Sequence, residues 1–189
     1  DGAEEAPERA TAINAEAPGV LAAAAQETGA WLVHYSTDYV FDGTQRRPYT
    51  EGDAPNPINV YGRTKREGEQ RIAALGGRHV ILRTSWVYSA RRSNFVRTML
   101  GLADTHDQPT VVGDQTGVPT WAGWIAEATA SIGAQLFRDD DPSDSGLYHL
   151  TGRGQTSWYG FAQAIFAQFE RSVTVEPVPS SEYPTPAAR

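Results

Sequence analysis

Tyr61 and Lys65 are the two residues whose types and spacing most directly suggest chemistry in this sequence. They are four positions apart, so on a helix they would project as neighbours from one face. A tyrosine hydroxyl has a reference pKa of about 10, and a nearby ammonium group would lower that pKa. Lys65 is the single lysine among 16 Lys and Arg residues, and its compact ammonium differs from the planar guanidinium fork of arginine. The pair therefore predicts acid–base catalysis by Tyr61.

The spacing of Tyr61 and Lys65 is a weak signal when it is taken alone. Tyr-x-x-x-Lys also occurs by chance, and a chain rich in arginine can keep one lysine for no functional reason. The elements that would position the pair, and the residues that would surround it, therefore decide its interpretation.

Composition excludes several classes of protein. The formal net charge is −7, which leaves no cationic surplus for binding nucleic acid. There are no cysteines, so disulfides, thiolate metal sites and a cysteine nucleophile are excluded. No apolar run approaches the roughly 20 residues that span a bilayer, and the acidic, alanine-rich start is no signal peptide. The four histidines show no metal-ligand spacing, so no metal-binding residues are predicted from spacing.

Apolar patterning predicts that helices and strands alternate along the chain. After an initial loop, helices are expected at 17–29, 61–75, 94–104, 121–137 and 157–170, and strands at 30–36, 79–88, within 109–120, and at 147–152. Gly29 is expected to end the first helix, and Ser157 to cap the last. This alternation predicts an α/β fold, a doubly wound parallel sheet covered on both faces.

Ligands of such sheets bind beyond the carboxyl ends of the strands. The segments to inspect are therefore 36–38, which follows the first strand, and Ser85–Trp86, near the end of the second. Tyr61 and Lys65 begin the helix that connects these two strands. A long loop rich in Pro, Gly and Asp, residues 37–59, precedes this helix.

Four segments together resemble the extended short-chain dehydrogenase/reductase family. They are "HYSTDYVFDG" (34–43), "YTEGDAPNPINVYGRTKREGE" (49–69), "ILRTSWVY" (81–88) and "VVGDQTGVPT" (111–120). The resemblance covers nearly the whole chain. It implies a Rossmann-like fold with a small C-terminal substrate-binding portion. It also implies an enzyme that reduces dTDP-4-dehydro-6-deoxy-L-mannose to dTDP-L-rhamnose with NADPH or NADH, in the cytoplasm.

The resemblance assigns the family's catalytic set to Thr37, Tyr61 and Lys65. Tyr61 would protonate the carbonyl oxygen as hydride arrives. Lys65 would lower the pKa of Tyr61 and hydrogen-bond the nicotinamide ribose, so that Tyr61 and Lys65 both adjoin the cofactor. Thr37 would hydrogen-bond the reacting oxygen. As an alternative, Thr37 could simply form a local turn or cap, since its hydroxyl can bond nearby backbone.

The resemblance also points to contact residues. Tyr35 matches a cofactor-contacting position, while Asp38 and Trp86, together with Thr37, match positions that touch the sugar nucleotide. A further family motif near the substrate contains Gln115, Pro119 and Thr120, to which no roles are assigned. Each contact has a structural alternative: Tyr35 could pack against the sheet, Asp38 could form a turn, and Trp86 could belong to the core. Magnesium and a homodimer are expected by family resemblance only.

The sequence departs from the family in one respect. A dinucleotide-binding sheet needs a glycine-rich turn after its first strand, and none is found here. We expect residues 1–189 to be a single-domain fragment, with roughly residues 1–110 the remainder of the dinucleotide-binding Rossmann part and 111–189 mostly substrate-binding. The fragment alone is expected to bind NAD(P)H poorly and to be inactive. The choice between NADH and NADPH is left open.

Two other functions remain as alternatives. Nucleotide-sugar dehydratases carry an acidic pair after the threonine, but here Asp38 is followed by Tyr39, which favours simple ketone reduction over dehydration or epimerisation. The second alternative is a non-catalytic NADP-binding relative, such as the regulatory subunit of methionine adenosyltransferase. The complete Thr37, Tyr61 and Lys65 set favours an enzyme.

Overall fold

A computed structural model describes residues 2–188 and divides into two compact units. Unit 1 comprises Asp1–Thr84, Ala130–Leu150 and Thr185–Arg189, and unit 2 comprises Ser85–Thr129 and Thr151–Pro184. The chain thus passes between the units several times. The helix α6 (Ala122–Asp139) contributes residues to both units.

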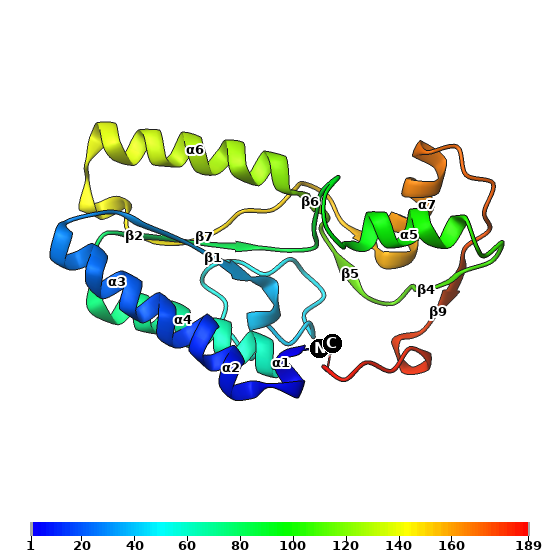
Figure 1. Ribbon diagram of the computed structural model, residues 1–189, viewed down its shortest axis with the longest axis horizontal. Helices are drawn as coiled ribbons and strands as arrows, with labels where there is room; N and C mark the ends of the chain where they lie inside the picture. Colours follow the sequence, from blue (N-terminus) through cyan, green and yellow to red (C-terminus); the bar gives the residue numbers. More distant parts are fainter. Residues whose placement is uncertain (1, 189) are drawn as a thin grey trace. The chain divides into compact units, whose positions relative to one another are not determined.

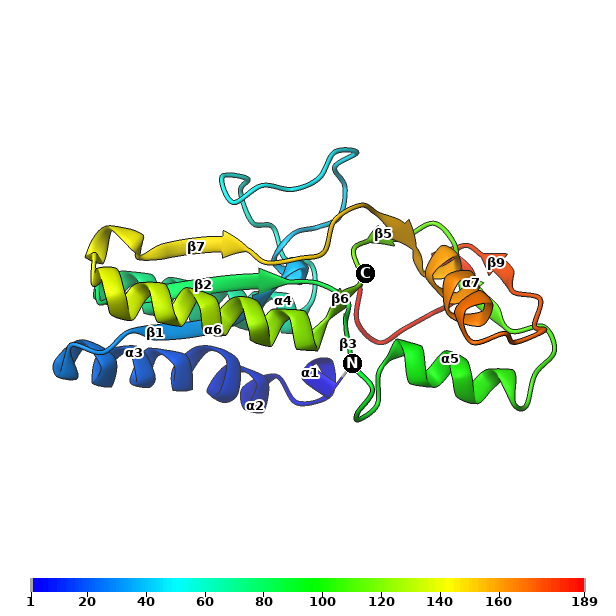
Figure 2. The same ribbon diagram turned by 90° about the horizontal axis from the view of Figure 1, so that it is seen from above.

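Unit 1 is built on a parallel three-stranded sheet of order β1-β2-β7. Its strands are β1 (Leu32–Thr37), β2 (His79–Thr84) and β7 (Gly146–His149). Figure 2 shows the three strands side by side in this order. Thr37 pairs with Thr84, and Arg83 pairs with His149, so the carboxyl ends of all three strands meet at one edge. The predicted parallel sheet is confirmed.

Helices cover both faces of this sheet. On one face, α3 (Ala17–Thr28) and α4 (Val60–Leu75) enclose a core of Ala22, Ile72 and Ile81. On the other face, Leu136 of α6 packs with Val80 and Leu82 of β2. Figure 1 shows α3 and α4 on one side of the strands and α6 on the other. Adjacent residues of β2 therefore point to opposite faces, as burial of a strand on both faces requires.

The ends of these helices follow local chemistry. Gly29 and Gly76 end α3 and α4 with φ of 68° and 66°, the left-handed conformation that glycine adopts without penalty. The Asn59 side chain accepts a hydrogen bond from the Gly62 N–H at 2.7 Å and thereby caps α4. These boundaries match the predicted ones.

The expected loop at the start of the chain is wrong. Residues from Gly2 onward form α1 (Gly2–Glu5), α2 (Pro7–Thr11) and a π-helical turn (Ala12–Glu16) that leads into α3. These alanine-rich segments have high helix propensity and pack against α4. The close packing depends on Gly68, where an added Cβ would lie 2.1 Å from the Asn14 carbonyl oxygen.

Unit 2 has a small aromatic and aliphatic core between two helices. Met99 of α5 (Phe95–Ala103) packs with Ile165 and Phe166 of α7 (Trp158–Gln168). Ser157 caps α7 by accepting a hydrogen bond from the Gly160 N–H, as predicted. The strands form the pairs β3 (Val87–Tyr88) with β6 (Thr120–Trp121), β4 (Thr110–Val112) with β9 (Glu176–Val178), and β5 (Thr116–Gly117) with β8 (Thr156–Ser157).

The strand predicted over 79–88 is interrupted. It stops at Thr84, and Trp86 adopts a φ of 44°, which ends the strand before β3 begins.

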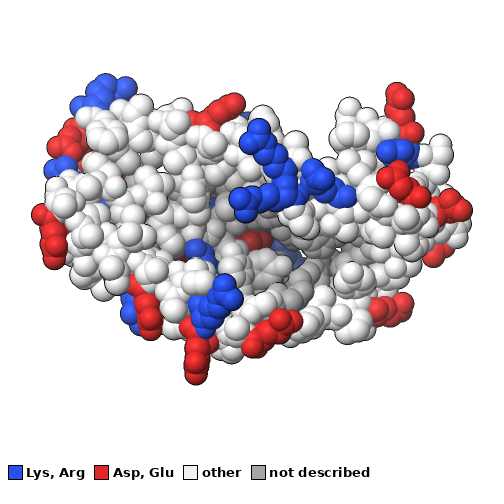
Figure 3. All heavy atoms as spheres, in the orientation of Figure 1, with Lys and Arg blue, Asp and Glu red and all other residues white. Residues whose placement is uncertain are grey.

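Short 3-10 helices cover Asp38–Val40, Pro142–Asp144 and Ser180–Glu182. On the face drawn in Figure 3, acidic and basic side chains are interspersed with broad uncharged areas. Between residues 2 and 188, no helix is long and apolar enough to cross a membrane.

Candidate active site

Helix α4 begins against the turn that follows β1, and Gly62 makes this approach possible. A Cβ at Gly62 would lie 2.1 Å from the Tyr39 carbonyl oxygen and 2.9 Å from its carbonyl carbon. Any side chain at this position would therefore push the first turn of α4 away from the turn Asp38–Val40. The neighbouring residue Tyr61 is brought to the turn after Thr37 in this way, and its ring meets that of Tyr39.

Thr37 has a local role as well as the contact with Tyr61. Its hydroxyl oxygen accepts from the Tyr39 N–H at 3.2 Å, and its proton is directed to Asp38 Oδ1 at 3.1 Å. The side chain is only 5% exposed. The structural alternative, a cap on the short 3-10 helix, is therefore correct.

The pKa of Tyr61 is raised in this structure, whereas Lys65 was expected to lower it. Burial of the hydroxyl is the largest cause, the nearby Thr37 side chain opposes it, and Asp38 and Tyr39 add to it. The ring is 38% exposed and meets Tyr39 edge to face, at 5.8 Å between centroids. A raised pKa keeps the phenol protonated at neutral pH, which is the form that a proton donor needs.

Lys65 does not lower the pKa of Tyr61 because its amine contacts β1 instead. Lys65 Nζ donates to the Tyr35 carbonyl oxygen at 2.6 Å and lies 3.2 Å from His34 Nε2. Burial lowers the pKa of Lys65, and the Glu69 carboxylate opposes that shift. Burial and the Lys65 charge together lower the pKa of His34 to about 4, so a neutral imidazole accepts from the ammonium.

Asp38 lies beside Thr37 in a poorly solvated position. Burial raises its pKa to about 6, although hydrogen bonds from the Thr37 hydroxyl and from backbone N–H groups oppose the shift. The carboxyl group therefore titrates close to neutral pH, well above the pH at which an ordinary aspartate titrates. Tyr35 presents an exposed ring on β1, next to the buried Ser36 and Thr37.

The remaining predicted contact residues belong to unit 2. Trp86 is half-buried and stacks on Trp158 with ring centroids 3.5 Å apart. Gly117 packs under the indole, since a Cβ there would lie 2.4 Å from the Trp86 ring. The side chain of Gln115 donates to Ser180 Oγ at 3.0 Å, and Thr120 is buried. Trp86 thus has substantial packing of its own, as its structural alternative proposed.

Sequence reasoning missed a buried network next to the predicted catalytic set. Glu69 and Arg83 form a two-bond ion pair at 2.7 Å, and Ser36 donates to the same carboxylate. Two signals were present in the sequence. Glu69 follows Lys65 by four residues on the same helix face, and Arg83 interrupts an otherwise apolar strand. The sequence pattern also assigned no role at the site to His34, yet its ring contacts the Lys65 amine.

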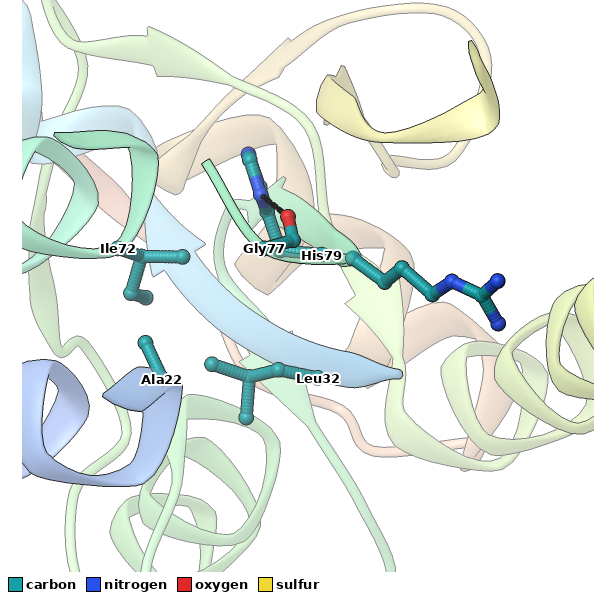
Figure 4. Close-up of a pocket in the computed structure, with 6 residues that line it drawn as sticks. Ala22, Leu32, Ile72, Gly77 and His79 are labelled. Carbon is teal, nitrogen blue, oxygen red and sulfur yellow. Dashed lines mark hydrogen bonds between the residues drawn. The ribbon is translucent and has the colours of Figure 1, made fainter. Parts of the chain in front are cut away.

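A small pocket lies at the opposite end of the sheet and is not the site. It is lined by Ala22, Leu32, Ile72, Gly77, Arg78 and His79 (Figure 4). Leu32 and His79 are paired at the amino ends of β1 and β2, whereas Thr37 is at the carboxyl end. His79 Nδ1 donates to the Gly77 carbonyl at 2.7 Å, which satisfies the polar atom drawn there. Across residues 2–188, no cluster of three or more His, Cys, Asp or Glu side chains could hold a metal.

Comparisons with known proteins place the chain in a family. The model of the RmlD substrate binding domain matches residues 1–189. A dTDP-4-dehydrorhamnose reductase of Burkholderia thailandensis is 47% identical over 200 residues, which cover 100% of this chain and 67% of that protein. A reductase of the same name from Escherichia coli K12 is 43% identical, over 100% of this chain and 64% of its own length.

Solved structures agree. The crystal structure of a dTDP-4-dehydrorhamnose reductase from Clostridium acetobutylicum matches with a TM-score of 0.92 and 42% identity, covering 100% of this chain and 65% of that one. One from Bacillus anthracis, in complex with NADP, matches with a TM-score of 0.90 and 39% identity over the same shares. The chain spans about two thirds of the length of these relatives. It belongs to the RmlD substrate-binding-domain family.

Proposed function

We propose that this chain belongs to an enzyme that reduces dTDP-4-dehydro-6-deoxy-L-mannose to dTDP-L-rhamnose with NADPH or NADH. Relatives at 43% and 47% identity bear the name dTDP-4-dehydrorhamnose reductase, which supports this assignment. The observation that carries the proposal is that the first turn of α4, which bears Tyr61, packs against the turn that follows Thr37, with Lys65 one helical turn further along α4. The three residues lie at the carboxyl edge of a parallel sheet, where such folds bind ligands.

The residues at this edge fit a nicotinamide cofactor. Lys65 carries three N–H donors, and its acceptors within residues 2–188 are the Tyr35 carbonyl and His34. One donor therefore remains for a ribose hydroxyl, and Tyr35, which is exposed on β1, is proposed as a further cofactor contact. The NADP complex of the Bacillus anthracis relative supports the same class of cofactor. When bound, the cofactor supplies the hydride.

Tyr61 and Thr37 act on the ketone oxygen at carbon 4 of the sugar. Tyr61 donates its phenolic proton to this oxygen as it gains negative charge. The Thr37 hydroxyl donates a second hydrogen bond and fixes the oxygen in position, after giving up its bond to Asp38. Because the pKa of Tyr61 is raised by burial, the phenol carries its proton at the start of each turnover at neutral pH.

Asp38 and Trp86 are proposed to hold the sugar nucleotide. Asp38 offers a buried carboxylate next to Thr37, a suitable acceptor for a sugar hydroxyl. A cytoplasmic location, a homodimer and a bound magnesium ion stay expectations of the family resemblance, and equilibrium sedimentation with and without magnesium tests the last two.

Turnover by the whole protein tests this proposal. Purified protein is mixed with NADPH and dTDP-4-dehydro-6-deoxy-L-mannose, the absorbance of the reduced cofactor is followed, and the product is identified by NMR. We expect one dTDP-L-rhamnose for each NADPH oxidised. Binding of NADPH without any turnover would refute the proposal and favour the non-catalytic alternative.

A further inference from the structure

Glu69 is a fully buried charged residue on the helix that carries Tyr61 and Lys65. Only 1% of its surface is exposed. Its carboxylate accepts four hydrogen bonds: from Ser36 Oγ at 2.6 Å, from Arg83 Nε and Nη2 at 2.7 Å each, and from Arg66 Nη1 at 2.9 Å. Arg83 is itself 3% exposed. The carboxylate is therefore enclosed by donors.

The partners of Glu69 are adjacent to catalytic positions. Tyr61, Lys65 and Glu69 are spaced by four residues each, so they run along one side of α4. Ser36 immediately precedes Thr37 on β1, and Ser36 pairs with Arg83 in the register of β1 and β2. The bonds of Glu69 thus join the helix of the proton donor to the strand of Thr37, one residue away from the reacting group.

Stability alone is a poor reason for this network. The free energy needed to remove two charges from water offsets most of the free energy gained from their attraction. Apolar residues of similar size often stabilise a protein equally well. Among residues 2–188, Arg83 Nη1 is also a buried donor with no partner, which adds to the cost. An ion pair does, however, fix distance and orientation, whereas an apolar contact allows the helix to slide or rotate.

Glu69 also acts on the charge of Lys65. The carboxylate lies one helical turn from the amine and favours its protonated form, opposing the effect of burial on the Lys65 pKa. Removing the negative charge would therefore leave a buried amine that loses its proton more easily.

We propose that Glu69 is a positioning residue, which fixes Tyr61 and Lys65 of α4 against Thr37 of β1 through its bonds to Arg83 and Ser36. The catalytic part of this inference rests on the reductase activity proposed above. Glu69 touches neither substrate nor cofactor in this scheme, and its effect passes through the helix and through the charge of Lys65.

The test uses the whole protein with Glu69→Gln, a matched surface control and an apolar replacement of the pair. The control is Glu67→Gln, on the same helix, where the exposed Glu67 pairs with Arg71 at 2.7 Å. The apolar variant is Glu69→Met with Arg83→Met. At temperatures below the melting temperature of the variant, we expect Glu69→Gln to lower kcat by about 10- to 100-fold. Displacements of catalytic groups by about 1 Å have effects of this size. Glu67→Gln should leave kcat unchanged.

Two readouts separate positioning from a merely structural role. The apolar double variant should melt at or above the temperature of Glu69→Gln yet stay as impaired in kcat. In Glu69→Gln, the NMR titration midpoint of Lys65, identified by the signal lost in Lys65→Arg, should fall. A folded double variant with the kcat of the unaltered protein, or an unchanged Lys65 midpoint in Glu69→Gln, would overturn the inference.

The two proposals fail in distinguishable ways. If the unaltered protein does not reduce the dTDP-sugar, the proposed function fails. The Lys65 midpoint and the effect of Glu69→Gln on the Tyr61 ring signals then still decide whether Glu69 positions α4. If the unaltered protein turns over and Glu69→Gln matches it, only the positioning role is refuted.

Discussion

Replacing Asp38 by asparagine should stabilise the protein at alkaline pH and not at acid pH. Burial raises the pKa of Asp38 to about 6 in the folded chain, from an ordinary value of 3.8. The folded state therefore binds more protons than the unfolded state between these values, and stability falls as pH rises from about 4 to 6. Above pH 7 the ionised carboxylate opposes folding by about 3 kcal/mol, because each pH unit between the two pKa values corresponds to roughly 1.4 kcal/mol.

Asparagine removes this charge and keeps the oxygen that accepts from Thr37 at 3.1 Å. We expect Asp38→Asn to be more stable by about 2–3 kcal/mol at pH 8, and nearly equal to the unaltered protein at pH 4. Urea unfolding at pH 4, 6 and 8 measures this difference. Its activity should fall, because the proposed contact with the sugar is altered.

Asp42→Asn is a control for which the expected change in stability at pH 8 has the opposite sign. The pKa of Asp42 is lowered, first by the Thr44 backbone N–H and then by Asn56, the Thr44 hydroxyl and Tyr49. The ionised Asp42 carboxylate stabilises the folded state at pH values above the pKa that it has in the unfolded chain. Asp42→Asn should therefore destabilise the protein at pH 8, and less so at acid pH. An Asp38→Asn variant that is equally or less stable at pH 8, or whose advantage does not change with pH, would refute the reasoning about Asp38.

Two further substitutions test the packing around the catalytic set. Lys65→Arg should lower kcat/KM by roughly tenfold or more despite the preserved charge, because the amine site beside Tyr35 and His34 suits a compact donor. A kcat/KM within twofold of that of the unaltered protein would contradict this expectation. Gly62→Ala should destabilise by about 2 kcal/mol or more in urea unfolding, because its Cβ would meet the Tyr39 carbonyl at 2.1 Å. The matched change Gly133→Ala, with open space around it on α6, should instead stabilise slightly, and equal effects at both glycines would argue against the close approach.

Much of unit 1 could be predicted because its signals are local. The apolar strand at β2, the glycine after α3 and the asparagine before α4 each determine a boundary through short-range sterics or hydrogen bonds. The helices before α3 were missed, because the acidic and proline-containing start resembles a loop until its packing on Gly68 is known. The end of β2 was also missed, since nothing local in the sequence shows that Trp86 takes a positive φ.

The candidate site was partly predictable for a related reason. The proximity of Tyr61 and Lys65 follows from their spacing on a helix, and the family resemblance identified Thr37, which lies on β1. The direction of the Tyr61 pKa shift was not predictable, because it depends on where the Lys65 amine points and on how deeply the hydroxyl is buried. Glu69 needed the register of β1 with β2, which only the folded chain provides.

The most direct test of the catalytic assignment is Tyr61→Phe in the whole protein. This change removes the phenolic proton and little else, since Thr37 keeps its bonds to Asp38 and to the Tyr39 N–H. We predict that kcat falls by about 10²- to 10⁴-fold while the Kd for NADPH changes by less than about threefold. A variant that keeps most of its turnover would contradict the role of Tyr61 as the proton donor.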